Sequence, residues 1–241
     1  MKNIYSYSFV IWCSLFLSLG SCQPKVGTAS SNNDNAALSL EQRNKTLEAL
    51  SLKSSKKPIH DSLSSEEIAL LEHGDIILRK GYGLISDLIA ILLEEENTVT
   101  HCGFVIKDSL QPNKIKILHI LSEGEHDGML LEPLETFILD SQENSLAVVR
   151  ANYPANIRAA VVNEALKFLA AKIPFDMAFD DSDSTAYYCS EMVRNAFMPV
   201  IGKDILPERV IRINKEGTTM KNFFNEENFT VVLNHNTRNL K

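Results

Sequence analysis

Apolar and polar positions alternate along the chain in blocks that predict both helices and strands. Ser64 and Glu67 have the form of a capping box before an apolar helical face that ends near Gly74. Residues 75–79 are then expected to form a short strand. Residues 84–93 are expected to form a strongly apolar helix. Its apolar stripe is wide, which indicates a core position or the border of an apolar groove.

Short apolar segments joined by polar links follow, a pattern typical of an antiparallel meander. Strands are expected over residues 101–106, 114–121, 128–131 and 146–150, and a helix over residues 156–171. A helix that begins near Cys189 comes next, then an irregular segment or short strand over 207–213, a short helix over 218–225 and a closing strand over 229–233. This order predicts one α+β domain over residues 64–241, with an antiparallel sheet or partial barrel packed against helices.

The pattern of the N-terminal residues is typical of an export signal. Lys2 is followed by an apolar segment, Phe9–Leu19, that is too short for a membrane-spanning helix. The ending Leu19-Gly20-Ser21-Cys22 resembles the lipobox of bacterial lipoproteins, although an ordinary secretory signal with a chance cysteine is an alternative. The resemblance implies a signal peptide at 1–21 and a lipid anchor on Cys22. Gln23 after it points to the outer membrane, facing the periplasm.

Residues 22–63 are rich in Ser, Asn, Ala and Lys and are expected to form a polar tether, with at most one short helix near 40–50. The net charge of −7, without a basic cluster, argues against a nucleic-acid partner. The membrane is the expected partner through lipid on Cys22. Loss of Cys13 with the signal would leave Cys102 and Cys189 as thiols.

Cys189 is the candidate nucleophile, since it lies where an acidic loop meets a predicted helix. Unpaired N–H groups and the dipole at a helix N-terminus favour a thiolate. A small buried apolar cysteine is the competing interpretation. The local pattern alone does not decide between them.

A nucleophilic cysteine needs a base, and His101 is the best-placed histidine, because it begins a strand directly after a polar loop. His119 lies between Leu118 and Ile120 in mid-strand and is expected at a surface or sheet face. Three further histidines are assigned to a helix end, a solvated link and a polar tail: His73, His126 and His235.

Four short motifs occur in one order along the domain: Gly74-Asp75-Ile76-Ile77, Thr100-His101-Cys102-Gly103-Phe104-Val105, Ser122-Glu123, and Tyr188-Cys189-Ser190-Glu191-Met192-Val193. This order resembles the permuted NlpC-type papain-like cysteine hydrolases, the YiiX-like group. The resemblance implies a papain-like α+β fold with Cys189 as nucleophile, His101 as base and Glu123 as the residue that orients the imidazole. Its further candidates for substrate contacts are Tyr187, Tyr188 and Asp75, although packing or a turn hydrogen bond explains each equally well.

Two features depart from the family pattern. Cys102 occupies a position that is commonly aliphatic, and strand alternation is expected to turn it into the core, away from Cys189, so no disulfide is predicted. The acidic segment at 180–183 would oppose thiolate formation if it came close. Glu125, two residues after Glu123, is an alternative orienting residue.

The expected activity is hydrolysis of an amide bond in a peptide, a peptidoglycan fragment or an amino-acid amide. A lipid acyl-ester hydrolase or acyltransferase is an alternative, because an apolar helix and a membrane tether also suit an acyl chain. A non-enzymatic ligand-binding lipoprotein is another. No cofactor or metal is expected: the acidic segment lacks the Gly and Glu of a calcium loop, and the histidines lack zinc spacing.

Overall fold

The computed structural model describes residues 60–236, apart from residues 96–98, 109, 124, 183 and 213–214. The expected signal peptide, Cys22, the helix near 40–50 and most of the tether lie outside the described residues. The folded unit begins before the expected boundary at Ser64, because Asp61 Oδ2 accepts hydrogen bonds from the backbone N–H groups of Ser145 and Leu146, each at 2.9 Å. None of the helices within the described residues has the length and apolar character needed to cross a bilayer.

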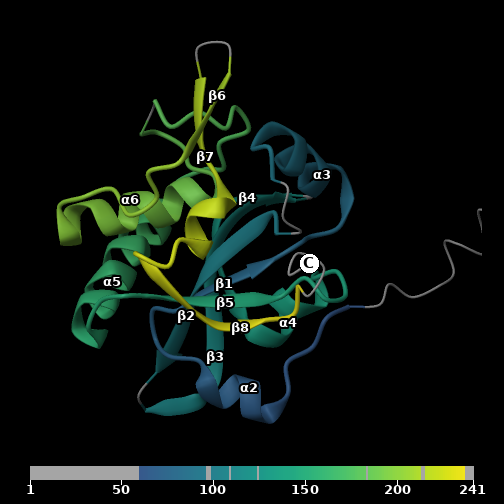
Figure 1. Cartoon of the computed structure of the whole chain (residues 1–241), viewed down its shortest axis with the longest axis vertical. Coiled ribbons are helices and arrows are strands. Elements are labelled where there is room, and N and C mark those ends of the chain that lie inside the picture. The colour runs from purple at the N-terminus through teal and green to yellow at the C-terminus, as the bar shows by residue number, and fades with distance from the viewer. Residues whose placement is uncertain are drawn as a thin grey trace, which may run out of the picture. The chain divides into compact units, whose positions relative to one another are not determined.

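A six-stranded antiparallel sheet in the order β4-β3-β2-β1-β5-β8 forms the framework (Figure 1). Its strands are β1 (Ile76–Arg79), β2 (His101–Asp108), β3 (Gln111–Glu123), β4 (His126–Pro133), β5 (Ala147–Ala151) and β8 (Phe229–Asn234). A separate hairpin pairs β6 (Arg209–Arg212) with β7 (Lys215–Thr218). The expected meander holds for β2, β3 and β4, but β5 pairs with β1 and β8. The α+β class is confirmed, and the sheet does not close into a barrel.

The helices are α2 (Ser65–Leu70), α3 (Gly83–Leu92), α4 (Leu134–Leu139), α5 (Ala155–Ala171) and α6 (Cys189–Ile201), with a 3-10 helix η1 (Met220–Phe224). The capping box of α2 is present, since Ser64 and Glu67 each accept the other's backbone N–H. Helix α4 and strand β7 were not expected from the sequence. Helix α4 lies in the connection between β4 and β5, and so between two strands that are not neighbours in the sheet.

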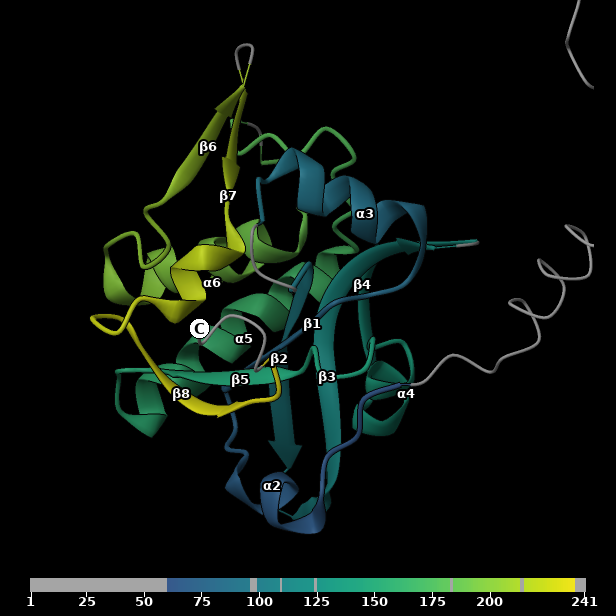
Figure 2. The same ribbon diagram turned by 45° about the vertical axis from the view of Figure 1, so that its right-hand side comes forward.

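The two faces of the sheet pack against different helices (Figure 2). Helices α5 and α6 cover one side, which we call the α6 face, and α4 covers the other, which we call the α4 face. Strand alternation directs Cys102 and Phe104 of β2 to the α6 face, and Val105 to the α4 face. The apolar side of α6 is fully buried, as expected from its spacing: Met192, Val193, Ala196 and Phe197.

Candidate active site

Cys189 is the first residue of α6 and is fully buried in the α6-face core. At the helix start Glu191 accepts the backbone N–H of Tyr188. The Ser190 hydroxyl donates to Thr218 O at 2.7 Å and so joins the helix start to the end of β7. The Cys189 thiol donates to the carbonyl of Thr100 at 4.0 Å. The sulfur therefore lies directly behind the residue that precedes His101.

The second thiol shares this environment. Burial raises the pKa of Cys102 well above its ordinary value, and a hydrogen bond with Cys189 raises it further. Cys102 thus points toward Cys189, and the prediction that it turns away was wrong. Alternation along β2 does separate it from His101, but the helix that carries Cys189 packs on the same face as Cys102. Both cysteines are free.

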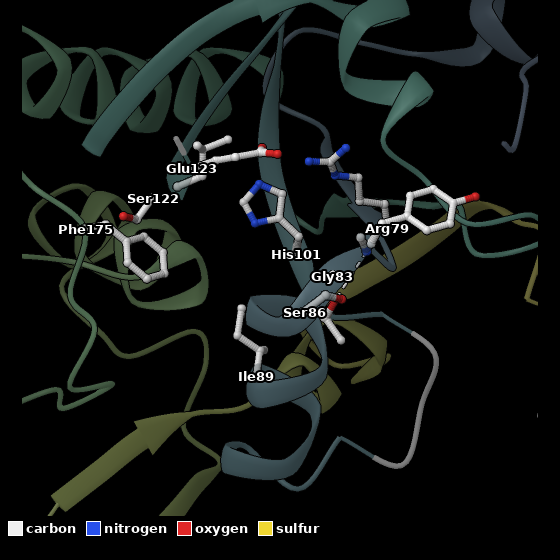
Figure 3. Close-up of a pocket in the computed structure, with 12 residues that line it drawn as sticks. Arg79, Gly83, Ser86, Ile89, His101, Ser122, Glu123 and Phe175 are labelled. Atoms are coloured by element: carbon white, nitrogen blue, oxygen red, sulfur yellow. Dashed lines mark hydrogen bonds between the residues drawn. The ribbon is translucent and has the colours of Figure 1, made fainter. Parts of the chain in front are cut away.

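His101 begins β2 and is 8 % exposed, lining a cavity of about 370 Å³. Its imidazole stacks on Phe137 of α4, with ring centroids 5.8 Å apart. In Figure 3 the carboxylate of Glu123 and the guanidinium of Arg79 point toward each other beside the His101 imidazole. The cavity is also lined by Ser86 and Ile89 of α3 and by Phe175, so the ends of β1, β2 and β3, one helix and one loop residue form its wall.

A buried polar chain extends from His101 along the α4 face. His101 Nε2 is 2.9 Å from His119 Nδ1, and His119 Nε2 is 3.0 Å from Glu132 Oε1, close enough for an ion pair although not in line for a hydrogen bond. His119 is completely buried. A carboxylate beside His119 Nε2 favours the proton on that nitrogen, so His119 Nδ1 accepts and His101 Nε2 donates. This tautomer leaves His101 Nδ1 with a free lone pair.

The electrostatic surroundings keep His101 in that neutral form. Burial lowers its pKa well below the ordinary value, and the positive charge of Arg79 and the neighbouring His119 lower it further. Burial also lowers the pKa of His119, while Glu132 acts in the opposite direction. A neutral imidazole with an unprotonated nitrogen is the form that accepts a proton.

A family model of the permuted papain-like amidase enzymes (YaeF/YiiX, C92 family) matches residues 70–236, which include all of these groups. The chain belongs to this amidase family. The crystal structure of the metalloprotein yiiX from Escherichia coli O157:H7 has the same fold, with a TM-score of 0.55 and 17 % identity over 68 % of this chain and 97 % of that chain. A comparison with curated proteins gives no match.

Among the described residues, the side chain that hydrogen-bonds to the His101 imidazole is His119 and not Glu123, the residue expected to orient it. Glu123 lines the cavity but is exposed at the end of β3. Glu125 is also exposed. A sequence signal for His119 existed: Ile117, Leu118 and Ile120 make both faces of the strand apolar, and a histidine inside such a strand is buried.

The two candidate tyrosines do not line the cavity next to His101. Tyr188 is fully buried, and its hydroxyl bonds to Asp181 and accepts the backbone N–H of Thr218. Tyr187 packs edge-on against Phe168 with ring centroids 5.1 Å apart. The structure therefore supports the packing interpretation for both rather than substrate contact.

Asp75 has a structural partner rather than a place in the cavity. Its carboxylate is fully buried and accepts from Arg150 Nε at 2.7 Å and Arg150 Nη2 at 2.8 Å. It also accepts the backbone N–H of Glu72 at 2.7 Å. These bonds fix the turn that leads into β1, and so they support the hydrogen-bonding alternative over a substrate contact.

One carboxylate of the acidic segment before α6, that of Asp181, is paired with an arginine. Asp181 Oδ2 lies 2.8 Å from Arg209 Nε and accepts from the Thr218 hydroxyl at 2.7 Å. Arg209 also pairs with Asp204 at 2.5 Å. The expected electrostatic repulsion between Asp181 and a thiolate is therefore weaker, because the carboxylate forms an ion pair with Arg209 and a hydrogen bond with Thr218 of the β6–β7 hairpin.

Within the described residues, no group of three or more His, Cys, Asp or Glu side chains is arranged to hold a metal ion. The two imidazoles nearest the cavity bond to each other instead.

Proposed function

We propose that this chain is a thiol-dependent amidase in which Cys189 is the nucleophile, His101 the base and His119 the positioning residue. One observation carries the proposal: the buried chain from Glu132 through His119 ends at a neutral His101 on the cavity wall, and the thiol of Cys189 lies just behind that wall. The family to which the chain belongs is described as amidases, which supports the same reaction class.

The reaction would proceed in two steps. His101 Nδ1 takes the thiol proton as the sulfur attacks the amide carbonyl, and the imidazolium then gives this proton to the leaving amine. The backbone N–H of Cys189 at the start of α6 is the proposed oxyanion donor. In the second step His101 activates water, which breaks the thioester, releases the acid and returns the thiol. His119 keeps the imidazole in the required tautomer throughout.

The thiol must enter the cavity for this chemistry. In this structure Thr100 separates the sulfur from the cavity that Thr100 itself lines, and within the described residues no hydrogen bond joins Cys189 to His101. Helix α3 contributes Ile89 to the core around Cys189 and also to the cavity wall. The proposal therefore requires a movement that brings the Cys189 sulfur past Thr100 into the cavity.

The cavity favours an amide over a lipid ester. The cavity wall is mainly apolar, but Arg79 and Glu123 place opposite charges beside His101, and an acyl chain would leave these charges without a partner. Such groups suit the charged ends of amino acids and peptides. The lipid anchor on Cys22, which would hold the enzyme at the bacterial envelope near such substrates, is part of this proposal.

The test compares the reactivity of the two buried thiols in the full chain. Iodoacetamide is added at pH 7, and tryptic peptides 173–194 and 81–107 report modification of Cys189 and Cys102 separately. Cys189 is expected to react at least about tenfold faster than Cys102, because a base serves one thiol and not the other. His101→Ala should remove this difference.

Cys102→Ala is the matched control, since it deletes the neighbouring thiol on the same face while leaving His101 in place. It is expected to keep both the alkylation rate of Cys189 and the amidase activity, whereas Cys189→Ala loses the activity. Equal, slow alkylation of the two thiols that His101→Ala does not change would contradict the proposal and favour a binding protein.

A further inference from the structure

Arg79 is a buried cation in the wall of the cavity. It ends β1 directly opposite His101 in the sheet register, and the residue is 5 % exposed. Its Nη1 donates to the carbonyl of Phe137 at 2.7 Å, and its guanidinium carbon lies 4.4 Å from the centre of the Phe137 ring. The side chain is thus held rigidly, with its charge at the cavity.

The negative groups around Arg79 do not use its full hydrogen-bonding capacity. Asp140 Oδ2 lies 3.5 Å from Nη1, and that carboxylate is half exposed. Glu132 acts on Arg79 through its charge, but its carboxylate is next to His119. The carboxylate of Glu123 points toward the Arg79 guanidinium (Figure 3) and acts on it through its charge. Within the described residues Nε of Arg79 is buried without a partner.

Arg150 shows how this fold satisfies an arginine that has a purely structural role. Its Nε and Nη2 make a bidentate pair with Asp75, Nη1 bonds to Glu72 at 2.6 Å, and Nη2 also bonds to Leu70 O at 2.9 Å. An arginine fork matches one carboxylate with two parallel hydrogen bonds. Among the described residues no carboxylate makes such a bidentate pair with Arg79, although burying a charge without one is costly.

We propose that Arg79 is the binding site for a substrate carboxylate, so that the enzyme acts on amino acids or short peptides with a free carboxylate near the amide it cleaves. This specificity rests on the proposed amidase function. A substrate carboxylate bound to Arg79 would lie on one side of His101. The Cys189 thiol, which lies behind Thr100, would then approach the substrate amide from the other side.

A bound carboxylate would also change the imidazole. The charge of Arg79 lowers the pKa of His101, so an anion on Arg79 partly cancels that effect. The base would then gain proton affinity when substrate is present and a proton must be accepted. The negative charge of Glu123 disfavours a second negative charge beside it and favours a positive group there.

Titration calorimetry on the full chain with Cys189→Ser measures binding without turnover. The ligands are Nα-acetyl derivatives of the common amino acids, each paired with its primary carboxamide. For the side chains that bind, the free acid is expected to bind at least about tenfold more tightly than the carboxamide, a difference of about 1.4 kcal/mol. Because both ligands meet the same folded protein, the comparison does not depend on a variant.

Two variants locate the effect. Arg79→Lys keeps a positive charge but loses the fork, and it is expected to reduce the preference for the acid at least about threefold, with the fold checked by circular dichroism. Glu123→Gln, which removes the neighbouring negative charge, is expected to keep or increase that preference. Equal affinity for acids and carboxamides, no binding of any acid, or an unchanged preference in Arg79→Lys overturns the proposal.

The outcome is separate from that of the thiol test. A preference for acids without selective reactivity of Cys189 would leave the carboxylate site standing and remove the amidase. Selective reactivity of Cys189 without a preference for acids would do the reverse.

Discussion

The α4 face and the α6 face of the sheet hold their chemically active groups in opposite ways. On the α4 face His101, His119 and Glu132 form a connected polar chain that ends at a cavity. On the α6 face Cys189 and Cys102 are buried among apolar side chains, with a carbonyl as the oxygen contact of the Cys189 thiol. The first two residues of β2 carry one group to each face, since His101 points to the α4 face and Cys102 to the α6 face.

This difference shows that the base is pre-organised and the nucleophile is protected. An imidazole needs partners that fix its tautomer, and the α4 face supplies them. A thiol needs no partner while it is idle, and burial shields it from alkylating and oxidising reagents. Catalysis would then depend on joining two halves that are stored on opposite sides of one strand.

The largest expected effect comes from breaking the polar chain at His119. His119→Ala should lower kcat/KM by about 10²-fold or more for an Nα-acetyl amino acid that the enzyme hydrolyses, because His101 loses the acceptor that fixes its tautomer. Asn at this position offers a side-chain oxygen and should restore part of the loss. The matched control is His126→Ala on the neighbouring strand, whose imidazole contacts Gly128 O at 3.2 Å.

Activity of His119→Ala within about twofold of the wild type would show that the polar chain is structural. The pH profile of kcat and the folded fraction of His119→Ala distinguish a positioning role from a structural one. A change in the His101 tautomer alters kcat at every pH, whereas simple destabilisation reduces the amount of folded protein.

A substitution at Gly103 tests whether the close packing of β2 against β3 positions His119 beside His101. A Cβ on Gly103 would lie 2.6 Å from Ile117 Cγ2 and 2.9 Å from His119 Cβ. Gly103→Ala should therefore push β3 away, destabilise the fold by about 1 to 3 kcal/mol and separate His119 from His101. Urea unfolding and alkylation of Cys189 measure the two effects.

Cys102→Ala is the control on the other face of the same strand. It is expected to lower stability by about 1 kcal/mol without changing the alkylation of Cys189. If Gly103→Ala behaved in the same way, the spacing between β2 and β3 would have no part in positioning the base.

The sequence predicted the positions of the helices better than the side chains that lie next to one another in the fold. Periodicity and caps located α2, α3, α5 and α6 within a few residues, because local patterns determine where helices form. The residues that surround His101 come from β1, β3 and α4, and their approach depends on strand register and on a helix that was not expected. Glu123 was chosen by its position in a motif, whereas His119 is brought to His101 by the register Gly103↔His119.

The same reason explains the error at Cys102. Alternation correctly separated it from His101, but the face against which α6 packs is a tertiary property. The local sequence was sufficient for Cys189 at a helix start and for His101 at a strand start. It was insufficient for deciding whether they share a face.

The smallest expected effect concerns Glu95, a carboxyl at the edge of the α6-face core. Its Oε1 accepts the backbone N–H of Met220 at 2.5 Å, while Oε2 is buried without a partner among the described residues. Burial raises the pKa of Glu95 to about 7, and the bond from Met220 opposes this. A raised pKa contributes stability that is fully present below the unfolded value of 4.5 and is lost as the pH rises through about 7.

Glu95→Gln keeps an oxygen for Met220 and removes the charge. The variant should match the wild type near pH 4.5 and be more stable at pH 8, by on the order of 2 kcal/mol in the free energy of unfolding. Urea unfolding at both values measures this, with Glu135→Gln as a control because that carboxyl is exposed. A difference that is equal at both pH values would mean that the ionised carboxylate has a partner, and that the α6 face is more polar than the contrast with the α4 face implies.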